Sequence, residues 1–146
     1  MSVAAFPTVR GLHLLLILIF ACLLNACAPR LAPPGPGPEL GGPKLEPEHF
    51  ITADSLALPL RSWLPTSEPT AVILALHGFN DYSNAFTESA SEWARRGIAT
   101  YAYDQRGFGG GPNPGLWAGS AAMTGDLTDA ADALKQRYPD LPLFLL

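Results

Sequence analysis

Residues 71–76 read AVILAL and are followed at once by HGF at residues 77–79. The run is short, continuously apolar and partly β-branched, which is typical of a parallel strand buried on both faces. A second such run, IATYAY, occupies residues 98–103. Between the two runs, residues 83–96 carry apolar side chains at helical spacing. This strand-helix-strand unit predicts a right-handed crossover and parallel pairing.

The pattern on either side extends the same fold. Downstream, a second helix is expected from near residue 119 or 124 to residue 138, and a further buried strand begins at residue 143. Upstream, residues 50–52 and 56–63 predict an edge hairpin. An edge hairpin followed by β-α-β-α-β, with a mostly parallel sheet, places the chain in the α/β class.

Composition excludes several classes of function. The 146 residues carry a net charge of −4, which argues against a nucleic-acid-binding surface. Two cysteines form neither a disulfide framework nor a zinc site, and the histidines and carboxylates lack metal-ligand spacing. The G-x-G at residues 107–109 has no helix behind it, so it is a weak nucleotide signal. No metal, cofactor or nucleic acid is therefore expected.

Residues 1–26 have the features of a secretory signal peptide. Arg10 precedes an apolar run at residues 11–24, which is shorter than the roughly 20 residues of a membrane span. The segment LNAC at residues 24–27 resembles a bacterial lipobox. That resemblance implies that Cys27 takes the lipid and becomes the first mature residue, so that lipid rather than a helix holds the protein to the membrane.

This lipobox predicts a location in the bacterial cell envelope. Ala28, by resemblance to known lipoproteins, favours the outer membrane where the cell has one. An uncleaved inner-membrane anchor and plain secretion are the alternatives. Residues 27–48 then form a tether that follows the lipid, because residues 28–48 hold seven prolines and four glycines and bury little apolar surface. The folded domain is expected over residues 49–146.

Four motifs in the folded part have a specific order and spacing. They are LALHGF at 74–79, YDQRGFG at 103–109, Asp126-Leu127, and PDLPLFLL at 139–146. Together they resemble the α/β-hydrolase family, and within it the monoacylglycerol lipase and lysophospholipase-like serine hydrolases. The resemblance covers about residues 48–146 and implies the N-terminal half of the α/β-hydrolase fold.

The chemistry implied by this resemblance is acyl transfer, in which a serine attacks an ester carbonyl and backbone N–H groups stabilise the oxyanion. The resemblance assigns one such donor to the N–H of Phe79, and Gly78 is expected to let the chain turn tightly. His77 is expected to hydrogen-bond within its loop. It is not the base, because the catalytic histidine of this fold follows the nucleophile in the chain.

The second loop is expected to support the site. Asp104 and Arg106 are expected to form a short pair that fixes this loop, and Gly107 belongs to the same loop. Leu116 and Trp117 are expected near the acyl entrance.

No G-x-S-x-G occurs in the sequence. Relatives place this elbow just after the strand that begins at residue 143, so the serine, its acid and its histidine are expected beyond Leu146. The parent protein is expected to be a membrane-anchored serine hydrolase of carboxylic esters, with lysophospholipid or monoacylglycerol as substrate, and the fragment itself to be inactive. Two alternatives stay open. One is a dehalogenase-like relative with aspartate at the elbow, and the other is a non-catalytic lipoprotein, or degenerate hydrolase remnant, that acts as a surface binding module.

Overall fold

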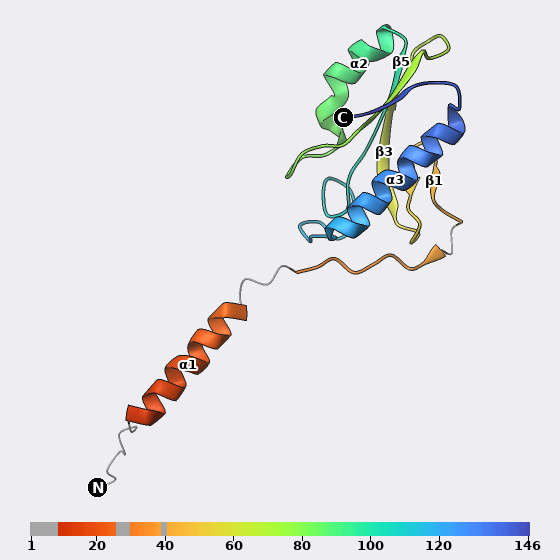
Figure 1. The fold of residues 1–146 in the computed structure, drawn as a ribbon. Coiled ribbons are helices and arrows are strands. Elements are labelled where there is room, and N and C mark those ends of the chain that lie inside the picture. The colour runs from red at the N-terminus through yellow and green to blue at the C-terminus, as the bar shows by residue number, and fades with distance from the viewer. Residues whose placement is uncertain (1–8, 26–29, 39–40) are drawn as a thin grey trace. The chain divides into compact units, whose positions relative to one another are not determined.

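The computed structural model of the chain describes residues 9–25, 30–38 and 41–146. The chain divides into two compact units, residues 1–30 and 31–146 (Figure 1). The first unit contains helix α1 (Val9–Asn25), which includes the apolar run of the predicted signal peptide. Within the described ranges, no helix is both long enough and apolar enough to cross a membrane. Cys27 of the predicted lipobox lies outside the described residues.

The second unit is built on a mixed sheet with the strand order β1-β2-β3-β5-β4-β6. Strand β4 pairs in parallel with β5 and with β6, as the apolar runs predict. Strands β2 and β3 form the predicted antiparallel hairpin, and β3 joins the sheet antiparallel to β5. The strands are β1 (Lys44–Leu45), β2 (His49–Ile51), β3 (Ala57–Trp63), β4 (Ala71–Ala75), β5 (Ile98–Tyr103) and β6 (Leu143–Leu145).

Helices cover both faces of this sheet (Figure 1). On one face, α3 (Ser120–Arg137) packs Ala130 and Leu134 into a core that includes Tyr101 and Tyr103 of β5. The alternate β5 residue Ala102 is also buried and points to the other face, against which the 3-10 helix η2 (Ser83–Phe86) and helix α2 (Thr87–Arg95) lie. Burial on both faces explains why the β5 sequence is apolar or aromatic except at Thr100.

The folded unit begins earlier than the sequence predicts. Strand β1 lies inside the segment expected to be a tether, and its Leu45 pairs with Phe50. Further upstream, the N–H of Ala32 donates to the Trp117 carbonyl at 2.8 Å, and the N–H of Gly37 donates to the Asp54 carbonyl at 3.1 Å. The expected spacer over residues 27–48 is therefore wrong for these segments. A proline removes a hydrogen-bond donor only at its own position. The N–H groups of Ala32 and Gly37 lie between prolines, and both find carbonyl acceptors in the folded unit.

Replacing Gly125 by alanine is expected to stabilise the protein by about 0.5–1 kcal/mol, because Gly125 lies inside α3, where glycine costs more backbone entropy than alanine. A Cβ at this position would meet no atom within 4 Å outside its own helix. Urea unfolding of the protein and of Gly125→Ala measures the difference. A variant that is no more stable than the parent would show that this stretch of α3 does not limit stability.

Candidate active site

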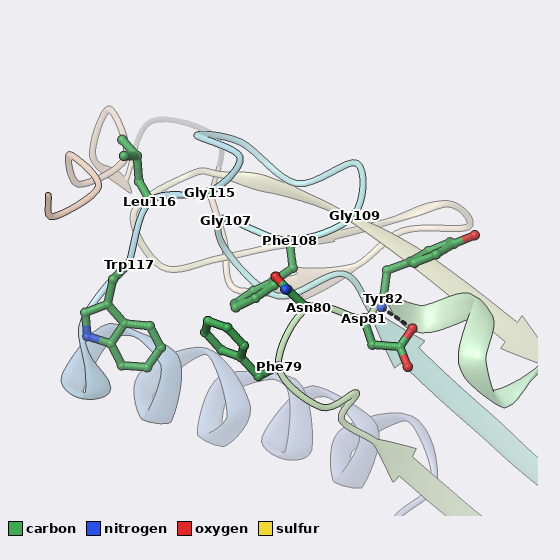
Figure 2. Close-up of a pocket in the computed structure, with 10 residues that line it drawn as sticks. All are labelled: Phe79, Asn80, Asp81, Tyr82, Gly107, Phe108, Gly109, Gly115, Leu116 and Trp117. Atoms are coloured by element: carbon green, nitrogen blue, oxygen red, sulfur yellow. Dashed lines mark hydrogen bonds between the residues drawn. The ribbon is translucent and has the colours of Figure 1, made fainter. Parts of the chain in front are cut away.

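Two loops meet at the carboxyl ends of the neighbouring parallel strands β4 and β5, which is where open α/β sheets bind ligands. A pocket of about 290 Å³ lies between these loops (Figure 2). Aromatic rings from both loops face it, and Trp117 lies beside the start of α3. The lining residues are Phe79, Asn80, Asp81, Tyr82, Gly107, Phe108, Gly109, Gly115, Leu116 and Trp117.

The first loop presents Phe79 at this pocket. The Asp81 N–H donates to the Gly78 carbonyl at 3.2 Å, which closes a turn with Phe79 and Asn80 at its centre. The Phe79 side chain is 81% exposed, and within the described residues the Phe79 N–H makes no hydrogen bond. A backbone donor is thus free at the pocket, at the position that the resemblance assigns to the oxyanion hole.

The expected role of Gly78 needs correction. Its φ is not in the left-handed region, and a Cβ built there would meet no atom within 4 Å. The left-handed residue of this turn is Asn80, whose φ is 61°. Asparagine tolerates that conformation better than most residues, so the tight turn depends on Asn80.

His77 is buried and joins the two loops. Its Nε2 accepts a hydrogen bond from the Gln105 N–H at 3.0 Å, so Nδ1 carries the proton and donates to the Gly78 carbonyl at 2.9 Å. The Gln105 side-chain amide donates back to the His77 carbonyl at 2.7 Å. Both ring nitrogens are therefore engaged in positioning the loops, in line with the prediction that His77 hydrogen-bonds locally.

Asp104 does not pair with Arg106, contrary to the sequence expectation. Its carboxylate accepts hydrogen bonds from the Ser83 N–H at 2.9 Å, the Ser83 hydroxyl at 2.5 Å and the Gly110 N–H at 2.8 Å. Burial alone would raise the pKa of Asp104, but these hydrogen bonds lower it overall. Asp104 thus fastens the second loop to the start of η2.

Arg106 binds a different set of partners. Its guanidinium donates two hydrogen bonds to Asp126 on α3, at 2.6 and 2.7 Å. It donates two more to Asp54, in the turn between β2 and β3, at 2.7 and 2.6 Å. The hydrogen bonds that Arg106 donates to the Asp126 carboxylate hold the pKa of Arg106 above its ordinary value. This bidentate fork ties the second loop to the hairpin and to α3.

The contribution of Asp54 to the stability of the protein is expected to fall in acid. Hydrogen bonds from Arg106 hold the pKa of Asp54 well below its ordinary value of 3.8. The ionised Asp54 carboxylate therefore stabilises the folded protein, and this contribution is fully present above pH 3.8. It is lost as the pH falls through the lowered pKa of the folded state. Urea unfolding at several pH values should show a smaller acid loss in Asp54→Asn than in the parent. Equal acid losses would contradict the assignment.

Gly107 shapes the pocket wall. Its φ is 83°, and a Cβ there would collide with the Leu116 carbonyl oxygen. The Gly115 N–H donates to the Gly107 carbonyl at 2.8 Å, which holds the segment of residues 115–117 against the loop. Next to it, the Phe108 ring lies edge-on between His77 and Phe79, with centroid distances of 5.5 Å to each. Leu116 and Trp117 line the pocket, where the sequence places the acyl entrance.

Three supporting residues escaped the sequence reasoning. The sequence assigns no supporting role to Ser83 or Asp54, and Asp126 stands out only as part of the Asp126-Leu127 motif. The pairing of Asp126 with Arg106 could have been found from the resemblance motifs, which contain both residues. No spacing rule connects Asp54 to Arg106, which lies 52 positions later. In the described part of the chain, no group of three or more potential metal ligands lies together.

The chain is similar to known proteins. A model of the family described as "Serine aminopeptidase, S33" (Hydrolase_4) matches residues 67–146. The chain is 28% identical over 118 residues to the monoglyceride lipase of Homo sapiens, which covers 75% of this chain and 39% of that protein. It is 30% identical over 97 residues to an uncharacterized abhydrolase domain-containing protein of Dictyostelium discoideum, which covers 66% of this chain and 10% of that protein.

A soluble variant of the monoglyceride lipase of Saccharomyces cerevisiae, solved with a substrate analogue, has a similar structure. It superposes with a TM-score of 0.58 at 20% identity and covers 79% of this chain and 38% of that one. At this identity the likeness shows the fold alone, and it confirms the predicted N-terminal half of an α/β-hydrolase fold. The chain spans less than half the length of each of these relatives.

Proposed function

The chain belongs to the serine aminopeptidase S33 family of α/β-hydrolases, and from this premise we propose that the whole protein is a serine hydrolase of carboxylic esters. One observation carries the proposal. A backbone N–H without a hydrogen-bond partner among the described residues, that of Phe79, stands at a pocket lined largely by aromatic side chains and glycines. Such a donor is what the oxyanion of an acyl-transfer transition state requires.

The roles of the residues follow from that chemistry. A serine attacks the ester carbonyl, and the negative charge that develops on the carbonyl oxygen accepts a hydrogen bond from the Phe79 N–H. The nucleophile, its acid and its histidine come from the part of the protein that follows β6, since no G-x-S-x-G lies in residues 1–146. His77, Asp104 and Arg106 position the two loops and take no proton in the reaction.

The substrate proposed is an ester with one apolar acyl chain, either a monoacylglycerol or a lysophospholipid. The lining of the pocket supports an apolar chain, because Phe79, Phe108, Leu116 and Trp117 all face it. The similarity to the monoglyceride lipase of Homo sapiens supports the same substrate class. Relative rates of hydrolysis of monoolein and lysophosphatidylcholine distinguish the two substrates.

The test of this function uses the whole protein with p-nitrophenyl esters and these two lipids. Hydrolysis is expected, and replacement of the elbow serine by alanine should abolish it. Activity that persists unchanged in the serine variant would sink the proposal, as would the absence of hydrolysis with every ester.

The proposed location is the bacterial cell envelope, with lipid on Cys27 as the anchor and the outer membrane as the destination. Cells grown with labelled palmitate should incorporate it into the protein. Cys27→Ala should lose both the label and partition into the detergent phase, whereas Cys22→Ala, inside the apolar run, should keep both. Equal labelling of the two variants would contradict the lipobox assignment.

A further inference from the structure

The segment that follows the proposed anchor is fastened to the wall of the pocket. Leu31 forms a parallel bridge with Trp117, and the N–H of the next residue, Ala32, donates to the Trp117 carbonyl at 2.8 Å. Trp117 lines the pocket. The chain runs only four residues from Cys27 to Leu31, and such a stretch spans at most about 14 Å when fully extended.

A second attachment holds this segment, residues 31–37, against the rest of the folded unit. We call residues 31–37 the strap. The Gly35 N–H donates to the Asp54 carboxylate at 2.7 Å. A Cβ at Gly35 would collide with the Asp54 carbonyl, so the two backbones are in close contact. Asp54 is itself held by the Arg106 fork. The strap is therefore attached near Leu31 to Trp117 at the pocket wall, and at Gly35 to Asp54.

Large apolar side chains are exposed where the strap meets the pocket. Leu31 is 64% exposed, Phe79 81% and Trp117 38%, and we call these three residues the rim. Phe79 and Trp117 stand on the same side of the pocket (Figure 2). A group of exposed apolar residues beside a pocket marks a site of interaction, and tryptophan favours the boundary between lipid and water.

We propose that the rim rests on the lipid surface to which Cys27 anchors the protein, so that the pocket draws its ester directly from the membrane. The short connection between Cys27 and Leu31 favours a lipid surface as the partner of the rim. An anchor four residues from Leu31 keeps the rim at the membrane, whereas the long spacer predicted from sequence would let the domain move freely. This inference rests on the proposed ester hydrolysis and on the proposed lipid anchor.

The test uses the whole lipidated protein on vesicles of phosphatidylethanolamine and phosphatidylglycerol. Trp63 and Trp93 are replaced by phenylalanine, and quenching of the tryptophan fluorescence by brominated lipid is measured with Trp117 in place and in a matched Trp117→Phe protein. A flexible Gly/Ser insertion of about ten residues between Arg30 and Leu31 lengthens the connection. The same insertion between Ser67 and Glu68, in the loop between β3 and β4, is the matched control.

Quenching that requires Trp117 is expected in the parent and in the Ser67 control, and it should be lost in the lengthened variant. Hydrolysis of monoolein in vesicles should fall about tenfold in the lengthened variant, because the rim no longer stays at the surface. Hydrolysis of soluble p-nitrophenyl acetate should not change.

Absence of Trp117 quenching in the parent would overturn the inference, whether the cause is a missing lipid or a rim covered by another part of the protein. Equal quenching and equal vesicle hydrolysis after lengthening would overturn it as well. Failure of the proposed function has a different signature, which is quenching without hydrolysis of any ester, soluble p-nitrophenyl acetate included.

Discussion

Replacing Phe79 by proline is expected to lower kcat for ester hydrolysis by about 10²–10³-fold, because it deletes one donor of the oxyanion hole. The Phe79 N–H makes no hydrogen bond within the described residues, so its removal breaks no contact of the resting structure. The donor acts on the charge that develops in the transition state, and the loss should therefore appear in kcat more than in KM.

The turn around Phe79 makes this variant informative. Phe79 is the second residue of the turn that Gly78 and Asp81 close, with Asn80 left-handed behind it, and proline is favoured at that position. The fold should survive the change, as circular dichroism and thermal unfolding can verify. Phe79→Ala is the matched control, since it removes the exposed ring and keeps the N–H. Its kcat for a short ester should stay close to that of the parent.

A proline variant with full kcat would remove Phe79 from the oxyanion hole. An alanine variant that loses as much kcat as the proline variant would assign the effect to the ring and not to the backbone donor.

Replacing Arg106 by leucine is expected to destabilise the protein by about 3–5 kcal/mol, because it leaves the buried Asp126 carboxylate without its cation. The Arg106 side chain is 7% exposed and that of Asp126 4%, so water cannot compensate. Asp54, to which the strap is hydrogen-bonded, loses its cation at the same time. Urea unfolding of the whole protein measures the loss.

Two further variants test the cause of this loss. Arg106→Lys keeps the charge but cannot form the two-sided fork, so it should recover only part of the stability. Arg95→Leu removes a cation that pairs with Glu92 on the exposed surface of α2, and it should change the unfolding transition little. Equal effects of Arg106→Leu and Arg95→Leu would show that the buried network contributes no special stability.

The sequence predicts the strands well, but it predicts the long-range hydrogen bonds and ion pairs poorly, and both results have a physical reason. Strand β5 is buried on both faces, and β4 is buried on one face and half-buried on the other. Residues on both faces of these strands are therefore mostly apolar, and the sequence shows this as a mainly apolar run. The location of Phe79 at the carboxyl edge of the sheet could likewise be predicted, because it follows the strand directly in the chain, whereas its role in the oxyanion hole stays a prediction.

Long-range polar contacts leave no such pattern. Arg106 bonds partners 52 positions before it and 20 after it, and neither interval is a period of a helix or a strand. The strap could not be predicted for a similar reason. Its hydrogen bonds come from isolated backbone N–H groups, and the Pro/Gly-rich composition of the segment is typical of a spacer. The left-handed residue Asn80 was missed because the neighbouring glycine was the more obvious candidate.

The most direct test of the central claim is to label the whole protein with a fluorophosphonate, which modifies only an activated serine, and to map the labelled peptide. We predict one labelled serine, inside a G-x-S-x-G that follows β6, and slower labelling in Phe79→Pro than in Phe79→Ala. A protein that is not labelled, or a label that reacts equally fast in the two variants, would contradict the assignment of this site to a serine hydrolase.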